Sequence, residues 1–387
     1  MQLQKLSFTD HQSGWHLSAT EFFPDLTLLV GVSGVGKTRI LQAIRMLRGV
    51  ADGSERQTHW GLGFDVDFSD GRNLYSWACQ FETRPAGNGE TLLDDGPILA
   101  DHMKGPVARS RVLRETLTEN GDVLIERDAG GIRLRGQPTP KLSPHDSALK
   151  MLSHEERISA AHHCFQQILA VDQSEDTDAS SGIFISGIGG HLDQYPTVEE
   201  LRESRLKTLV KLAIAQERHP RFFESIAAQF MEVFPQVEAV RVNRLRLVEP
   251  QEILSLAIKE RGVRKWIHEP FIASGMMRTI MHLARIALWP AGTLILIDEF
   301  ENSLGVNCID FVTKSLVEQS RRMQFIITSH HPYIINNISP AHWKIVSRRG
   351  SEVTTQNASD LGLEQSSHQA FIKLLNSEAY QEGIAAG

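Results

Sequence analysis

A glycine-rich segment near the N-terminus, GVSGVGKT at residues 31–38, has the residue types and spacing that phosphate binding requires. It fits the pattern G-x-x-x-x-G-K-[ST], in which backbone N–H groups surround phosphate oxygens at the positive end of a helix dipole. In such a loop Lys37 reaches the β- and γ-phosphates and Thr38 binds Mg²⁺. The candidate nucleotide-binding residues are Gly31, Ser33, Gly34, Val35, Gly36, Lys37, Thr38 and Arg39.

The residues on either side place this segment between a strand and a helix. Residues 26–30 form a short apolar run, typical of a buried strand. The residues that follow the loop put four apolar side chains on one helical face: Ile40, Leu41, Ile44 and Leu47. This is the strand–loop–helix context of a P-loop, so we expect the chain to bind ATP with Mg²⁺.

A second apolar run, residues 294–297, ends in two carboxylates, Asp298 and Glu299. A P-loop core needs a carboxylate near Thr38 to hold magnesium, so Thr38 and Asp298 are the candidate metal ligands. Glu299 is the candidate catalytic base, because a second carboxylate beside the γ-phosphate can orient or deprotonate the attacking water. Lys37 and Asp298 must then meet in one sheet, and the long segment between them is expected to form lobes inserted in one ATPase core.

Two further stretches contain candidate site residues. Ser274 and Gly275 precede an apolar helix pattern, where they would form either a second anion site or an ordinary helix cap. His330 follows another strand pattern and is placed to hydrogen-bond the γ-phosphate and sense its loss. The adjacent His331 does not suggest a shared metal site, because neighbouring residues on an extended chain point to opposite faces.

The bulk composition is that of an ordinary globular protein. The chain has 387 residues, 41% hydrophobic and 22% charged, and a net charge of −7 argues against a wholly basic nucleic-acid binder. Its three cysteines are far apart, which suggests neither a disulfide framework nor a zinc site. We see no signal peptide and no apolar run approaching the ~18 residues of a membrane span, so we expect a cytoplasmic protein without membrane contact.

The pattern of elements predicts an α/β fold, a P-loop NTPase with a mixed sheet, an antiparallel β subdomain and an inserted helical lobe. Ser-Asp-Gly and Asn-Gly turns indicate hairpins, and residues 197–200 form a capping box that begins a helix. We expect residues 1–387 to form a single head. Its expected parts are a core of residues 1–50 and 251–347, a β-hairpin subdomain of residues 60–142, a helical lobe of residues 143–235 and a C-terminal helix of residues 365–387.

Four segments together resemble the ATP-binding-cassette (ABC) ATPases of the SMC-like branch: the P-loop, Ser274–Gly275, ILIDEFENSLG and TSHHPYIINN. They are most similar to the ATPase part of OLD nucleases and to stand-alone ATPases of bacterial anti-phage systems. The resemblance implies that Ser274–Gly275 is the signature loop, Asn302 and Ser303 the D-loop, and His330 the switch histidine. It also implies a homo-oligomer, in which the signature loop of one head closes on ATP held by another.

The sequence departs from the family pattern in two places. The signature loop, Ile-Ala-Ser-Gly, lacks the second serine and the trailing glutamine or glutamate. The magnesium-contacting glutamine is also not assigned, since Gln80 and Gln137 are both candidates.

Three functions are compatible with these motifs. The residues after Tyr333 are too few for the metal-binding Toprim domain of OLD nucleases, so we expect an ATPase that acts as sensor or scaffold for a separate effector, a nuclease or toxin. The alternative is a DNA-repair or chromosome-associated ATPase that binds DNA. A transporter subunit is disfavoured by the inserted lobes and by the Glu-Asn after Asp298-Glu299-Phe300. Basic residues that would favour DNA binding, or form a solvated sheet face, are Arg241, Arg244, Arg246, Lys259, Arg261, Arg264 and Lys265.

Overall fold

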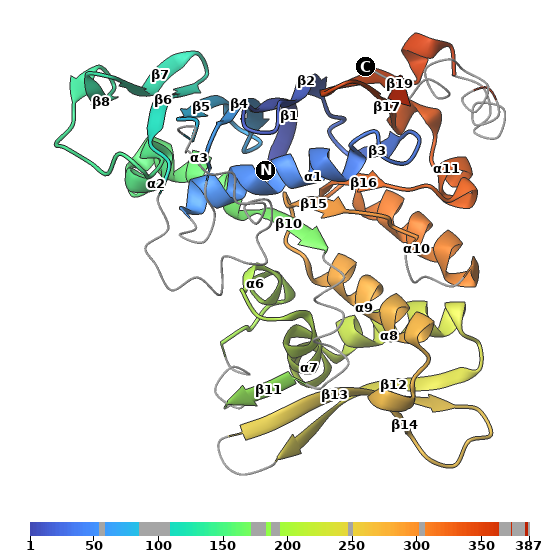
Figure 1. Cartoon of the computed structure of the whole chain (residues 1–387). Coiled ribbons are helices and arrows are strands. Elements are labelled where there is room, and N and C mark those ends of the chain that lie inside the picture. Colours follow the sequence, from blue (N-terminus) through green and yellow to red (C-terminus); the bar gives the residue numbers. More distant parts are fainter. Residues whose placement is uncertain are drawn as a thin grey trace, which may run out of the picture.

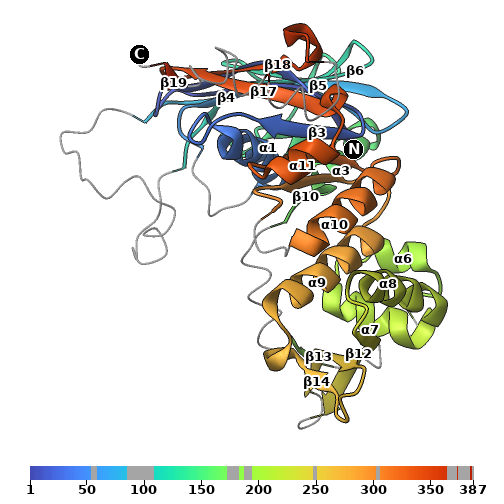
Figure 2. The same cartoon turned by 90° about the vertical axis from the view of Figure 1, so that its right-hand side faces the viewer.

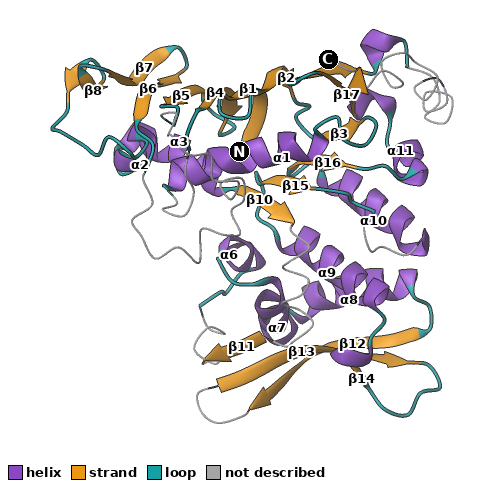
Figure 3. Ribbon diagram, viewed as in Figure 1, coloured by secondary structure: helices purple, strands orange, loops and turns teal. Residues whose placement is uncertain are grey.

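The computed structural model describes residues 1–53, 59–84, 109–171, 183–186, 194–246, 251–301, 306–363, 373 and 384–385. Within these residues, one 15-stranded mixed sheet and one 4-stranded sheet lie at opposite ends of the molecule, with helices between them (Figure 1). The mixed α/β fold expected from the sequence is confirmed. Figure 3 shows the same two groups of strands in orange, separated by the helices in purple.

Parallel strands form one end of the large sheet, in the order β10-β15-β16-β3-β17. Their bounds are β10 (Ile168–Val171), β15 (Leu294–Ile297), β16 (Gln324–Thr328), β3 (Leu26–Val30) and β17 (Trp343–Arg349). The middle three are mostly apolar and buried along their whole length, because a parallel strand is covered on both faces. The carboxyl ends of these strands therefore meet at one edge of the sheet.

The rest of the large sheet is mainly antiparallel and continues without a break from the parallel part. In spatial order its strands are β18 (Glu352–Asn357), β2 (Trp15–Glu21), β1 (Gln2–Asp10), β4 (Leu62–Ser69), β5 (Leu74–Phe81), β6 (Val112–Glu119), β7 (Asp122–Asp128), β8 (Gly131–Leu134) and β9 (Gln137–Pro138). The hairpins expected over residues 60–142 are present, but they extend the core sheet instead of forming a separate one.

Helices cover the large sheet and connect it to the second one. Those packed near the large sheet are α1 (Lys37–Asp52), α2 (Ala148–Met151), α3 (Glu156–Gln166) and α11 (Pro332–Asn337). Those between the two sheets are α6 (Val198–Glu203), α7 (Thr208–Arg218), α8 (Pro220–Val233), α9 (Ser274–Leu288) and α10 (Val306–Gln319). The capping box that begins α6 is present, since the Thr197 and Glu200 side chains each accept a backbone N–H of the other residue.

The second sheet has the order β11-β13-β12, with β14 beside β13. Its strands are β11 (Ile183–Ser186), β12 (Val237–Arg246), β13 (Gln251–Glu260) and β14 (Ile267–His268), and the 3₁₀ turn η2 (Glu269–Phe271) leads from it to α9. Figure 2 shows this sheet at the end of the lobe farthest from the large sheet.

Two boundaries differ from the expected ones. The sequence pattern predicts residues 148–171 in the helical lobe, but α2 and α3 pack against α1, and β10 is a parallel strand of the core. The pattern also predicts residues 251–260 in the core, but they form β13 of the second sheet. The physical reason is strand pairing: β10 pairs with β15, and β13 pairs with β12, the strand directly before it in the chain.

The expected C-terminal helix, residues 365–387, lies almost wholly outside the described residues. Within that range Lys373 is helical, while Ile384–Ala385 form β19, which pairs with β17. Two short 3₁₀ turns, η3 (Pro340–His342) and η4 (Ser359–Leu361), flank β17 and β18.

Alternate residues of the central strands belong to two different hydrophobic cores. On β3, Leu28 and Val30 join the core that includes α7, α8 and α9, whereas Leu29 joins the core that includes α1. Side chains along a strand alternate between faces, so one apolar strand supports a core on each side of the sheet. The loop that follows β3 is therefore held by packing on both faces.

We expect Leu28→Ala to lower the free energy of unfolding by about 2–5 kcal/mol, because the wild-type side chain is fully buried and its truncation leaves a cavity. Leu74→Ala is the matched control: Leu74 also lies on a strand but is 55% exposed, so its change should stay within about 0.5 kcal/mol. Chemical denaturation measures both. Equal effects of the two variants would contradict the packing described for β3.

Candidate nucleotide site

Three neighbouring parallel strands bring the predicted site residues to one edge of the large sheet. The P-loop follows β3, Asp298 follows β15, and His330 lies two residues after β16, which is between the other two strands. In an open α/β sheet, ligands bind at the carboxyl ends of the strands. The sheet order thus brings together segments that are about 260 residues apart in sequence.

The P-loop backbone has conformations that favour glycine. Gly34 and Gly36 have φ angles of 85° and 107°, which side-chain-bearing residues rarely adopt. At Gly31 a Cβ atom would lie 2.6 Å from the carbonyl oxygen of Val346, so β17 also excludes a side chain there. The glycine spacing is therefore required by this loop conformation and by its contact with the sheet.

The remaining P-loop residues differ in exposure. Ser33 and Thr38 are exposed, whereas Val35 is fully buried under the loop. The guanidinium of Arg39 lies 5.0 Å from the ring centroid of Trp15. Arg348, which the sequence did not indicate, reaches the loop from β17 and donates to the Gly34 carbonyl at 3.5 Å.

A chain of hydrogen bonds joins the P-loop helix to the end of β15. The Thr38 hydroxyl donates to Asp298 Oδ1 at 3.2 Å, and the Thr328 hydroxyl donates to the same oxygen at 2.6 Å. Thr328 also accepts the backbone N–H of Glu299 at 2.8 Å. Two hydroxyls and one carboxylate converge here. Mg²⁺ prefers such hard oxygen ligands, which substrate phosphates would complete. The residues present therefore fit a magnesium ion.

Glu299 adopts the left-handed backbone conformation, with φ of 47°. This conformation is unfavourable for a residue with a Cβ atom and costs on the order of 1–3 kcal/mol. It is held by the hydrogen bond to Thr328, and it leaves the Glu299 side chain exposed while the neighbouring Asp298 is half-buried. Two adjacent carboxylates thus occupy different environments, as separate roles for them require.

Lys37 is 5% exposed, and its ammonium group donates to the carbonyls of Gly31 at 2.7 Å and Val32 at 2.9 Å. Burial lowers its pKa to about 8, against the opposing effect of Asp298, Glu301 and Glu299. Lys37 therefore faces three carboxylates. An anionic phosphate would stabilise its charged form further.

Glu301 is a site residue that the sequence analysis missed. Its Oε1 accepts the backbone N–H of His330 at 2.6 Å, and its Oε2 is buried with no hydrogen-bond partner in the described part of the chain. The pKa of His330 is lowered mainly by burial, and also by Lys37. Glu301 thus fixes the loop that presents His330. In the sequence, Glu301 stands out only as the last residue of the Asp-Glu-Phe-Glu run. No neighbouring residue in the chain indicates that it contacts His330.

The structure places the other predicted residues elsewhere. Ser274 and Gly275 begin α9, which packs against α7, α8 and α10. The N-cap residue of α9 is Ala273, and no side chain among the described residues caps the helix there. Ser274 is exposed within the first turn and does not occupy the N-cap position. The D-loop candidates, Asn302 and Ser303, lie outside the described residues.

The two glutamine candidates for the magnesium contact remain unassigned. Gln80 lies on β5 and Gln137 on β9, both exposed on antiparallel strands of the sheet extension. Neither strand ends beside β3 and β15 in the sheet order.

The pKa of Lys37 predicts that ATP binding takes up protons at high pH. Lys37 is charged below its pKa of about 8, and phosphate binding favours the charged form. ATP affinity should therefore fall as pH rises above about 8, by up to about tenfold per unit, because binding must first protonate Lys37. Calorimetry at pH 9 in buffers of different ionisation enthalpy should show uptake approaching one proton.

Lys37→Arg is the control for this titration, because its guanidinium stays protonated across the range. The uptake should disappear in that variant. Equal proton uptake by both proteins at pH 9 would show that another group titrates.

Comparisons with known proteins agree with this type of site. A family model described as "AAA domain, putative AbiEii toxin, Type IV TA system" matches residues 194–336, which include Ser274, Asp298 and His330. None of the curated proteins compared with the chain matches it. Among the described residues, no helix is both long and apolar enough to cross a bilayer.

Several solved structures have a similar arrangement at low sequence identity. An Smc head bound to the C-terminal winged-helix domain of ScpA has a TM-score of 0.49 at 16% identity, over 92% of this chain and 98% of that one. An Smc head with an extended coiled coil, bound to the C-terminal domain of ScpA derived from Pyrococcus furiosus, has a TM-score of 0.49 at 15% identity, over 97% and 100%. The SMC head domain from Thermotoga maritima has a TM-score of 0.40 at 16% identity, over 92% and 99%. The chain is thus similar to an AAA-type ATPase domain over residues 194–336, a range that contains Asp298 and His330 but not the P-loop.

Proposed function

We propose that this chain hydrolyses ATP and acts as an ABC-type sensor or scaffold that controls a separate effector, a nuclease or toxin, in anti-phage defence. The observation that carries the ATPase part is the contact between Thr38 and Asp298, because it unites the two halves of a magnesium–ATP site. The defence part is supported by the description of the matched family model, which names a putative toxin of a toxin–antitoxin system, whereas control of a separate effector is the proposal's own step.

The site residues divide the work of phosphoryl transfer. Lys37 and the P-loop N–H groups bind the phosphates, and Thr38 with Asp298 would hold Mg²⁺, which neutralises charge on the phosphate oxygens. Glu299 accepts a proton from the attacking water, and His330 hydrogen-bonds the γ-phosphate. Glu301 is a positioning residue, because it holds the backbone of His330.

We further propose that ATP joins two heads into a homo-oligomer. The support is the exposed start of α9, where Ser274 lies three residues after Phe271, whose side chain is 82% exposed. Helix N-termini favour anions, so this surface is suited to the ATP of a second head. Hydrolysis would then separate the heads.

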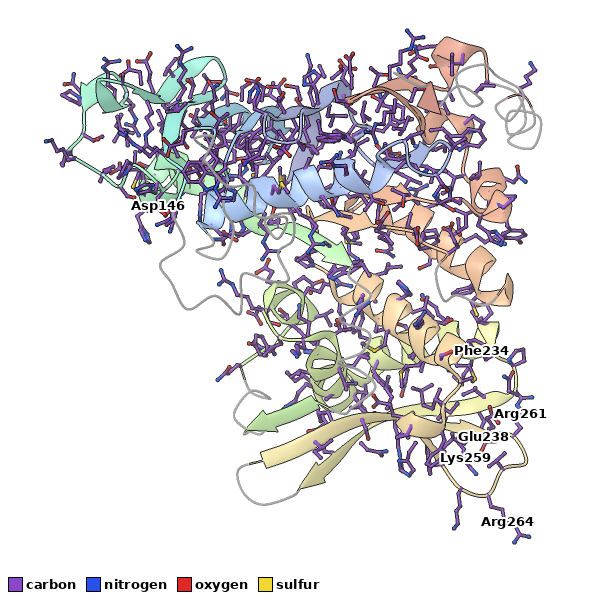
Figure 4. All side chains as sticks on the ribbon, viewed as in Figure 1. Asp146, Phe234, Glu238, Lys259, Arg261 and Arg264 are labelled. Atoms are coloured by element: carbon purple, nitrogen blue, oxygen red, sulfur yellow. The ribbon has the colours of Figure 1, made fainter. Side chains whose placement is uncertain are left out.

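A DNA-associated role in repair or chromosome maintenance is the alternative. One observation favours it: the turn between β13 and β14 exposes Arg261, Arg264 and Lys265, and Arg241 stacks 3.9 Å over the ring of Trp266 nearby. Figure 4 shows Arg264 projecting from the far end of the lobe. Salt-dependent binding of duplex DNA, lost on charge reversal at these positions, would support this alternative.

Gly275→Glu tests the pairing of heads. A carboxylate at the start of α9 should repel the ATP of a partner head, so the hydrolysis rate should fall at least tenfold while ATP binding to the single chain stays unchanged. Gly275→Ala is the control, since alanine suits a helix and adds no charge. Equal loss of ATP binding and hydrolysis in the glutamate variant would mean that Gly275 has a structural role in its own chain.

Glu299→Gln and Lys37→Ala test the proposed cycle. The first keeps size but removes the base, so hydrolysis should slow by ~10²–10⁴-fold while ATP stays bound. The second removes a phosphate contact and should impair ATP binding itself.

Affinity capture from the native cells, with each variant as bait, should recover a nuclease or toxin with one variant and not with the other. Recovery of the same proteins with both would contradict nucleotide control, and a wild-type rate in Glu299→Gln would exclude Glu299 as the base.

A further inference from the structure

A cleft of about 950 Å³ lies between the large sheet and the inserted lobe. Its walls are the last turns of α1, the end of α3 with β10, the connection from α6 to α7, and the end of α9 with the turn after it. Figure 1 shows α6 and α9 below α1 and β10, which agrees with these walls. No residue assigned to the nucleotide site lines this cleft.

The cleft is basic although the whole chain is acidic. Among the described residues that line it, six are cationic: Arg48, Arg202, Arg205, Lys207, Lys211 and Arg285. Two lining residues are acidic, Asp52 and Glu203. The whole chain, by contrast, has a net charge of −7. Positive charge is thus concentrated at this place.

Backbone carbonyls hold several of these cations in position. Arg48 Nη1 donates to the Ile168 carbonyl at 2.7 Å, Arg202 Nε to the Ala287 carbonyl at 2.9 Å, and Lys211 Nζ to the Arg202 carbonyl at 2.6 Å. A carbonyl orients a cation but carries no net charge. These contacts therefore fix the positions of the cationic groups without neutralising their charge. The low-dielectric walls of a cleft concentrate the electric field of such charges.

Ion pairs neutralise part of the charge. Arg48 pairs with Asp52 at 3.4 Å, and Arg202 pairs with Glu199 at 2.9 Å. Lys211 is 6% exposed, and burial alone lowers its pKa to about 8. An anion in the cleft would offset this cost, because an opposite charge favours the ammonium form.

Apolar side chains form the other part of the lining. They are Leu169, Leu206, Met281, Leu288, Trp289 and Pro290. Trp289 is half-buried, and its carbonyl accepts a hydrogen bond from Arg322 at 3.2 Å, which fixes the turn after α9. An aromatic ring beside a positively charged groove is the combination on which bases of single strands stack.

We propose that this cleft binds a short single-stranded nucleic-acid segment, with its phosphates near Arg205, Lys207 and Lys211 and a base against Trp289. A pocket of this volume matches ligands of a few linked rings and phosphates. A duplex keeps its bases stacked inside, so it cannot offer them to Trp289 as a single strand does. The proposal depends on the cleft alone and not on the effector or the ATP cycle.

Fluorescence anisotropy with a labelled oligothymidylate of about eight nucleotides tests the proposal. This probe has no triphosphate, so its binding reports on the cleft rather than on the P-loop. The double variant Arg205→Glu/Lys207→Glu changes two exposed side chains at the cleft and should weaken binding at least tenfold. The matched control, Arg72→Glu/Lys141→Glu, makes the same charge change on exposed loops beside the antiparallel strands of the large sheet and should bind like wild type.

Trp289→Ala should weaken binding about fivefold or more, and Trp289→Phe should restore most of it, because stacking requires an aromatic face. A duplex of equal length and inorganic polyphosphate should both bind more weakly than the single strand. Equal binding by the two charge-reversed proteins would overturn the proposed location. Binding of duplex or polyphosphate as tight as that of the single strand would overturn the proposed ligand, and thermal unfolding of each variant checks that it is folded.

Discussion

Parallel pairing of β15, β16 and β3 is the constraint on which the nucleotide site depends. It places the P-loop, Asp298 and His330 at one sheet edge, although the first two lie about 260 residues apart. The Thr38–Asp298 hydrogen bond exists because these strands are in register, with Ile297 opposite Ile327 and Thr328 opposite Leu29. A shift in this pairing would separate the magnesium ligands and reverse the faces of the strands.

Burial on both faces maintains that pairing. Each central strand contributes alternate residues to two hydrophobic cores, one around α1 and one around the lobe helices. The inserted lobe is therefore attached to the same strands that end in the site. α1 begins at Lys37 and ends at the basic cleft, and α9 begins at Ser274 and also ends there. Each of these two helices thus begins at a surface that is proposed to contact ATP and ends at the cleft between core and lobe.

Charge is arranged differently at these two places. Lys37 is surrounded by carboxylates, which favour its charged form and position it for phosphate. In the cleft, backbone carbonyls position Arg48, Arg202 and Lys211, and two ion pairs neutralise part of the positive charge. Both arrangements favour a phosphate ligand. The nucleotide site combines its cation with a P-loop, whereas the cleft combines its cations with an apolar and aromatic wall.

The sequence by itself determined the local elements of the site. Glycine spacing specified the P-loop, apolar runs specified β3, β15 and β16, and the capping box at Thr197 specified the start of α6, because each depends on residues close together in the chain. Tertiary structure decided that residues 168–171, which lie in a stretch of helical pattern, form a strand of the core, and that the strand at residues 251–260 belongs to the second sheet, because pairing alone assigns a strand to its sheet. It also decided the role of Glu301 beside His330 and the convergence of cations at the cleft. These features depend on contacts between distant segments, and the spacing of residues along a chain contains no information on which distant side chains will meet.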